Sequence, residues 1–136
     1  MGSQLTKGSH SVYSIHLHVV FVTKYRRKAI TAPMLIRLKE IFSKVCSAQK
    51  SNLLEFNGEE DHVHLLLTIA PDTLISQLVA SLKAASSRLM RKEFAEQVNK
   101  FYGKPVFWHN SYCVISCGGA PLEIVKQYIN GQKQPS

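Results

Sequence analysis

Acidic residues and long apolar runs are scarce in this 136-residue chain. Only 9 aspartates and glutamates stand against 17 lysines and arginines, so the formal net charge is +8 with neutral histidines. No apolar run approaches the roughly 20 residues that a membrane-spanning helix needs, and no secretory signal pattern opens the chain. The sequence therefore favours a cytoplasmic protein with a polyanionic partner, whether RNA, DNA or an anionic membrane surface.

Cysteine is also rare, and its spacing excludes further classes. Cys46, Cys113 and Cys117 form no Cys-x-x-Cys pair and leave an odd thiol, which argues against a zinc knuckle or disulfide framework and for a reducing compartment. We expect all three to be small apolar packing residues.

Internal repeats and low-complexity tracts are missing, and a chain of this length builds one core. We therefore expect a flexible lead over residues 1–11 and a single domain over residues 12–136.

The pattern of apolar runs and turn signals predicts a split β-α-β fold. Strands are expected at 12–23, 52–59 and 62–69 and in the region 106–115, with helices beginning near 31 and 73. The order β-α-β-β-α-β is that of an α+β, ferredoxin-like (RRM-like) antiparallel sheet with two helices on one face. Such a sheet commonly meets nucleic acid through its open face.

Helix-start signals place the beginnings of the two helices. Thr31 stands just before Ala32-Pro33, and a proline in the first turn is compatible with a helix. Asp72 or Thr73 is expected to cap the second helix, whose buried face would begin at Leu74.

Two histidines at alternate positions mark the third predicted strand. Strand side chains alternate between faces, so His62 and His64 point the same way, and their ring nitrogens could reach one metal ion at about 2.0–2.2 Å each. The alternative is a pair of solvated or packed histidines, because two ligands do not make a site. His16 and His18 share a face of the first strand in the same way.

Two groups of basic residues could contact a nucleic-acid backbone. The first follows the first strand and surrounds Tyr25, and the second lies on the second half of the second helix. Each group is either a solvated charged surface or a phosphate-binding patch. The candidates are Lys24, Arg26, Arg27 and Lys28 in the first group, and Lys83, Arg88, Arg91 and Lys92 in the second.

A further helix is expected near the C-terminus, after Gly118 and Gly119, which are candidates for a hinge. Tyr128 and Gln132 are four residues apart on this helix and so share one of its faces. The sequence alone leaves two interpretations open. Either Tyr128 only packs against its neighbours and Gln132 is solvated, or both side chains take part in chemistry.

These motifs together resemble one family. That family is the HUH-type single-tyrosine transposases of the smallest bacterial insertion sequences (the IS-two-hundred type). The resemblance rests on three stretches: the run from Asp61 to Leu66, the run from His18 to Arg26, and Ser111-Tyr112-Cys113 followed by the helix with Tyr128. The resemblance extends from about residue 12 to residue 132. It implies a metal-assisted enzyme that cleaves and rejoins single-stranded DNA at insertion-sequence ends through a 5′-phosphotyrosine intermediate.

The resemblance also implies roles for individual residues. His62 and His64 would hold a divalent metal with Gln132 as the third ligand, and Tyr128 would be the nucleophile. Asp61 would orient an imidazole from behind or simply open the strand. The cofactor implied is Mg²⁺ or Mn²⁺. The partners implied are single-stranded DNA with hairpins near the element ends and a second copy of the chain, so that the tyrosine helix of one subunit completes the histidine pair of the other.

Three other functions remain open. A relaxase-like tyrosine nuclease would nick DNA without transposing it. A non-enzymatic single-strand-binding module of the same fold would bind nucleic acid without a covalent step. A metallohydrolase built on the histidine pair would turn over without any covalent protein–DNA species.

Overall fold

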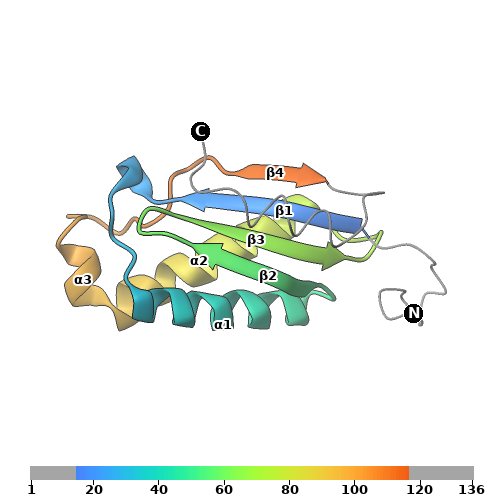
Figure 1. The fold of residues 1–136 in the computed structure, drawn as a ribbon, viewed down its shortest axis with the longest axis horizontal. Coiled ribbons are helices and arrows are strands. Elements are labelled where there is room, and N and C mark those ends of the chain that lie inside the picture. The colour runs from blue at the N-terminus through green and yellow to red at the C-terminus, as the bar shows by residue number, and fades with distance from the viewer. Residues whose placement is uncertain (1–14, 117–136) are drawn as a thin grey trace.

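An open sheet with antiparallel pairing organises the computed structural model, which describes residues 15–116 (Figure 1). The strand order is β2-β3-β1-β4, with β1 antiparallel to β3 and β4, and β2 antiparallel to β3. This order confirms the split α+β fold predicted from the sequence. The elements are β1 (Ile15–Val22), the 3-10 turn η2 (Lys24–Arg26), α1 (Ala32–Ala48), β2 (Asn52–Gly58), β3 (His62–Ile69), α2 (Ile75–Glu93), α3 (Ala95–Asn99) and β4 (Cys113–Ser116).

The two central strands present different side chains to their two faces. Odd-numbered residues such as Phe21 and Leu65 are fully buried in one hydrophobic core with residues of α1 and α2, which lie on the same side of the sheet (Figure 1). Because strand side chains alternate, the even-numbered residues face the other way. We call that second surface the histidine face; it comprises His16, His18 and Val20 of β1 and His62, His64 and Leu66 of β3, all of them buried.

The first helix begins where the sequence predicts. The Thr31 hydroxyl accepts a hydrogen bond from the Met34 N–H at 3.4 Å, and Pro33 stands in the first turn. Both features satisfy a helix start, because the first N–H groups of a helix have no partner inside it. Leu38 and Phe42, one turn apart, are fully buried beneath the sheet.

The second helix begins differently from the prediction. The Thr73 N–H donates to the Ala70 carbonyl at 3.0 Å, so this segment forms a turn and the helix starts only at Ile75. The residue at the cap position is Leu74, no side chain caps the helix there, and Leu74 is 66% exposed. The predictions that Asp72 or Thr73 caps this helix and that Leu74 is buried are therefore wrong.

The segment before β4 also departs from the prediction. Trp108 forms only an isolated bridge to Thr23, and the regular strand is confined to residues 113–116. Phe107 and Trp108 are instead buried in the core, 1% and 5% exposed. The short helix α3, which no periodic pattern indicated, precedes this segment.

Two expectations from composition have different outcomes. Cys46 is buried, and burial raises the pKa of its thiol to about 12, as befits an inert packing residue. Cys113 is exposed on β4, so the prediction that it packs in the core is wrong. Cys117 lies outside the described residues.

None of α1, α2 and α3 combines the length and the apolar character that crossing a bilayer requires.

The buried Ser86 joins α2 to the segment before β4, and its removal should destabilise the fold. Its hydroxyl accepts a hydrogen bond from Trp108 Nε1 at 2.8 Å and donates to the Leu82 carbonyl at 2.7 Å. Ser86→Ala leaves the indole N–H unpaired, so we expect the free energy of unfolding to fall by about 1–3 kcal/mol, measured by urea denaturation. Ser87→Ala, the adjacent and less buried serine, is the matched control. An equal effect of both substitutions would refute this role of Ser86.

Candidate functional site

Two neighbouring imidazoles form the centre of the histidine face. His62 is fully buried and His64 is 2% exposed. Their ring centroids are 4.9 Å apart and the ring planes are nearly perpendicular, at 88°. The two side chains therefore lie together on one side of β3, as the alternation of a strand predicts.

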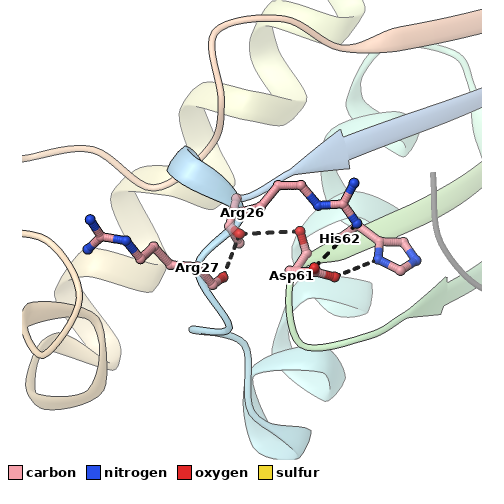
Figure 2. Close-up of polar contacts among 5 residues, drawn as sticks. Arg26, Arg27, Asp61 and His62 are labelled. Atoms are coloured by element: carbon pink, nitrogen blue, oxygen red, sulfur yellow. Dashed lines mark hydrogen bonds and ion pairs between the residues drawn. The ribbon is translucent and has the colours of Figure 1, made fainter. Parts of the chain in front are cut away.

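His62 is oriented by the carboxylate of Asp61. His62 Nδ1 lies 2.9 Å from Asp61 Oδ1, and Arg26 Nη2 donates to Asp61 Oδ2 at 3.4 Å. Figure 2 shows the Arg26 guanidinium and the His62 ring both beside this carboxylate. Burial alone would raise the pKa of Asp61, but the hydrogen bond from His62 and the charge of Arg26 outweigh it and lower that pKa. Asp61 is therefore an anion at neutral pH.

An anionic Asp61 determines which nitrogen of His62 carries the proton. A carboxylate only accepts hydrogen bonds, so His62 Nδ1 must be the donor. In a neutral imidazole the other nitrogen then holds a lone pair. His62 Nε2 is buried and has no hydrogen-bond partner among residues 15–116.

His64 is held in a different way, by a histidine of the neighbouring strand. His18 Nε2 lies 2.9 Å from His64 Nδ1, and the two rings stack with centroids 5.2 Å apart. Burial, followed by the nearby His62 and His18, lowers the pKa of His64 to about 4. His64 is therefore neutral at pH 7, and its buried Nε2 also lacks a hydrogen-bond partner in the described part of the chain.

The donor atoms of this pair suit a divalent cation. Two buried imidazoles whose Nε2 atoms have no hydrogen-bond partner among residues 15–116 are unusual, because buried polar atoms are normally hydrogen-bonded. Imidazole nitrogen is a common ligand of divalent metals, and a carboxylate behind a ligating histidine is the usual arrangement. No group of three His, Cys, Asp or Glu side chains that could hold a metal occurs among residues 15–116. Among residues 15–116, the two histidines could therefore supply only part of a metal's ligand set.

Buried neutral imidazoles should also make the protein sensitive to acid. Burial lowers the pKa of His16, His18 and His64 below the value of about 6.5 for an exposed histidine. The unfolded chain then binds more protons than the folded one at acid pH, so stability falls as the pH drops from about 6.5 toward about 4. We expect the urea midpoint, measured in EDTA, to be constant between about pH 7 and pH 8 and to drop steadily below pH 6.5. His64→Gln should reduce this drop, whereas a drop unchanged by that substitution would contradict the assignment.

The basic group that follows β1 forms a loop beside this pair. Arg26, Arg27 and Lys28 are exposed, and Lys24 is half-buried. Tyr25, in the middle of the loop, is 58% exposed, with Lys24 Nζ and Arg27 Cζ at 5.5 and 5.3 Å from its ring centroid. Arg26 links this surface to the site through its contact with Asp61.

The backbone of this loop is unusual and firmly held. Tyr25 and Arg26 both have positive φ angles, 59° and 53°, a region that non-glycine residues seldom occupy. The Tyr102 hydroxyl donates to the Lys24 carbonyl at 2.7 Å, and Arg27 Nη1 donates to the Phe101 carbonyl at 2.7 Å. Such strain persists only where the surroundings enforce it, and it is frequent at functional sites.

The basic residues of α2 are distributed differently, because α2 lies on the opposite side of the sheet from the histidine pair. Lys83 joins the basic loop: its ammonium donates to the backbone carbonyl of Asn110 at 3.0 Å, and Lys24 donates to the Asn110 side chain at 3.4 Å. Burial, and then the charge of Lys24, lower the pKa of Lys83. Arg88 and Lys92 are exposed, and Arg91 is partly buried.

Several predicted site residues lie outside residues 15–116: Gly118, Gly119, Tyr128 and Gln132. Within the described part, the sequence predicts that His18 shares a strand face with His16 but gives no role for it. Nor does the sequence distinguish Tyr25 from the basic residues around it. The role of His18 depends on the antiparallel register of β1 and β3, which the sequence does not give. The unusual conformation of Tyr25 is visible only in its positive φ angle.

Comparisons with known proteins point to one family. The family model described as "Transposase IS200 like" matches residues 11–132. The ISDra2 transposase TnpA of Deinococcus radiodurans is 28% identical over 129 residues, which cover 95% of this chain and 91% of the relative. The transposase for insertion sequence element IS200 of Salmonella typhimurium is 30% identical over 124 residues, covering 91% and 80%.

Solved structures agree with this similarity. The crystal structure of a candidate transposase from Deinococcus radiodurans R1 has a TM-score of 0.74 at 30% identity, covering 94% of this chain and 98% of that one. A REP-associated tyrosine transposase bound to a REP hairpin has a TM-score of 0.55 at 11% identity, covering 85% and 62%. The second likeness concerns the fold alone.

Proposed function

The chain belongs to the IS200-like transposase family, and from this premise we propose that it cleaves and rejoins single-stranded DNA at insertion-sequence ends. The reaction would proceed through a 5′-phosphotyrosine intermediate with the help of a divalent metal. The observation that carries the proposal is the pair of buried imidazoles whose Nε2 atoms have no hydrogen-bond partner among residues 15–116. A packing role alone would not require two neighbouring rings that each carry such an atom.

His62 and His64 would hold Mg²⁺ or Mn²⁺, with the side-chain oxygen of Gln132 as a third ligand. A metal bound to a nonbridging phosphate oxygen withdraws negative charge and makes the phosphorus easier to attack. Imidazole and amide ligands would add no anion of their own, so they would leave the charge of such an ion available to the DNA phosphate. Asp61 keeps His62 in the tautomer that binds metal, and Arg26 keeps Asp61 anionic.

Tyr128 would be the nucleophile. Its phenolic oxygen, after losing its proton, forms a bond to the phosphorus, and the bond from phosphorus to the 3′ oxygen breaks. That oxygen gains a proton and leaves as a free 3′-OH, while the 5′ phosphate stays on the tyrosine. One phosphoester replaces another, so a second 3′-OH can reverse the step and join strands without ATP. Gly118 and Gly119 would let the tyrosine helix swing to the metal.

The proposed substrate is single-stranded DNA with hairpins at the element ends, and the proposed assembly is a homodimer. Tyr128 of the partner subunit would then complete the His62–His64 pair of the first. The net charge of +8 supports a nucleic-acid partner. The exposed basic loop beside Asp61 would place the DNA backbone next to the histidine pair.

The basic loop can be tested separately from the chemistry. Each phosphate that a lysine neutralises steepens the dependence of log K on log salt by about 0.7 for a single strand. We therefore expect Lys28→Ala to reduce this slope by about 0.7, as measured by fluorescence anisotropy with single-stranded DNA between 50 and 200 mM salt. Lys44→Ala, an exposed lysine on α1, is the matched control and should leave the slope unchanged. Equal slopes for both variants would remove Lys28 from the interface.

The proposal as a whole is tested with end-labelled single-stranded hairpin DNA and Mn²⁺ on a denaturing gel. A slowly migrating protein–DNA adduct that is lost in EDTA is the expected result. DNA binding without an adduct would favour a non-enzymatic module, and cleaved DNA without an adduct would favour a metallohydrolase. An adduct that never yields joined strands, even with two element ends present, would favour a relaxase-like nuclease.

A further inference from the structure

His18 of β1 lies directly against His64 of β3 within the histidine face. The strand register places His64 opposite Val20, so His18 is its diagonal neighbour across the two strands. The rings are stacked at an interplanar angle of 19°, and His18 Nε2 lies 2.9 Å from His64 Nδ1. His18 is 1% exposed, so this hydrogen bond between two imidazoles is shielded from water.

One proton in this hydrogen bond determines the state of the far nitrogen of His64. A neutral imidazole has one N–H and one lone pair. If His64 Nδ1 donates, His64 Nε2 keeps its lone pair; if His18 Nε2 donates, His64 Nε2 bears the hydrogen and cannot bind a cation. His62 has no such choice, because its partner Asp61 is an anion and only accepts.

We propose that His18 is a positioning residue. Its Nε2 accepts a hydrogen bond from the Nδ1–H of His64, and so the lone pair of His64 Nε2 stays available for a cation. The two metal-binding imidazoles would thus be prepared by two different acceptors, a carboxylate for His62 and an imidazole for His64. This inference rests on the proposed function, in which His64 is a metal ligand. Partners of this kind fix both the tautomer and the orientation of a ligating ring.

The neighbouring His16 provides a matched control. It also belongs to β1 and to the histidine face, and at 7% exposed it is nearly as buried as His18. Its register partner is Thr68, two positions farther along β3 than the partner of His18, so His16 is more distant from His64. His16→Phe and His18→Phe make the same chemical change on the same face, and only the second removes the acceptor for His64.

The first measurement needs no metal and no DNA. Long-range ¹⁵N NMR of the full-length protein in EDTA reports which nitrogen of each histidine carries hydrogen. We expect hydrogen on Nδ1 of His64 in the wild type, in His16→Phe and in His18→Gln, whose side-chain oxygen can still accept. In His18→Phe we expect this preference to be lost. Hydrogen on Nε2 of His64 in the wild-type protein would overturn the proposal.

The second measurement is the dissociation constant for Mn²⁺, obtained by counting free Mn²⁺ with electron paramagnetic resonance. We expect His18→Phe to raise it about 10–100-fold, while His18→Gln and His16→Phe stay close to the wild type. Equal affinities of His18→Phe and His16→Phe would overturn the proposal. Should His18→Phe fail to fold, the His64 tautomer of the wild type decides: hydrogen on Nδ1 supports the proposal and hydrogen on Nε2 overturns it.

Failure of the proposed function would look different. If the wild-type protein bound no Mn²⁺, the metal site would be wrong, but the tautomer of His64 would still be measurable. An Nδ1 hydrogen that depends on His18 would then uphold the positioning of His64 and refute only its metal. Absence of that dependence would refute the role of His18, whatever the DNA chemistry proves to be.

Discussion

Replacing Tyr128 by phenylalanine is expected to abolish the covalent protein–DNA adduct, a loss of at least about a thousandfold. The substitution removes one oxygen atom, and that oxygen is the atom proposed to bond to phosphorus. The phenylalanine ring offers no oxygen in its place. Because the phenyl ring remains, packing should change little. The measurement is the denaturing gel with labelled hairpin DNA and Mn²⁺.

Tyr112→Phe is the matched control for this experiment. Tyr112 is 44% exposed beside Lys83 and lies on the segment that leads into β4. Its substitution removes the same hydroxyl group elsewhere in the chain, so adduct formation should continue. Both variants should bind single-stranded DNA as the wild type does, because the proposed backbone contacts lie in the basic loop. An adduct of undiminished yield from Tyr128→Phe would end the assignment of the nucleophile.

Some of the site is predictable from the sequence because it depends on neighbours along the chain. The strand His62–Ile69 has the bounds that its apolar run and the preceding turn signals predict. Alternation along one strand then suffices to put His62 and His64 on one face. The hydrogen bond from His62 to Asp61 is also local, since it joins adjacent residues.

Other parts of the site depend on segments far apart in the sequence. The hydrogen bond between His18 and His64 spans 46 positions and requires the register of β1 against β3. A shift of one residue would turn His18 into the core and break the contact. The ion pair between Arg26 and Asp61 spans 35 positions and depends on a loop with positive φ angles. No glycine marks that loop, so the sequence carries no signal for its shape.

The start of α2 was mispredicted for a different physical reason. Asp72 and Thr73 are both good helix caps, but the Thr73 N–H is used in a turn that closes onto Ala70. The chain must complete that turn before it enters the helix, so Leu74 takes the cap position without a polar side chain. Local propensity thus gave way to the geometry of the connection between β3 and α2.

Removing either of the two imidazoles proposed to bind the metal should have the second large effect. His62→Ala and His64→Ala each remove one proposed ligand atom, Nε2. Loss of the supporting partner of a ligating histidine typically weakens metal binding by roughly 10–100-fold. Loss of the ligand itself should weaken Mn²⁺ binding by more than that. Adduct formation should fall to the level of wild-type protein in EDTA. His109→Ala, an exposed histidine in the segment before β4, is the control and should bind Mn²⁺ normally.

This result separates metal assistance from the identity of the nucleophile. DNA binding should persist in both histidine variants, since the exposed cations of the basic loop stay in place. A variant that binds DNA, but does not bind Mn²⁺ and forms no protein–DNA adduct, would show that the histidine pair acts on the chemical step. If His62→Ala formed the adduct at the wild-type rate and EDTA had no effect, metal assistance would be refuted while Tyr128 could still be the nucleophile. The bare Nε2 atoms of the two imidazoles would then need an occupant other than a cation.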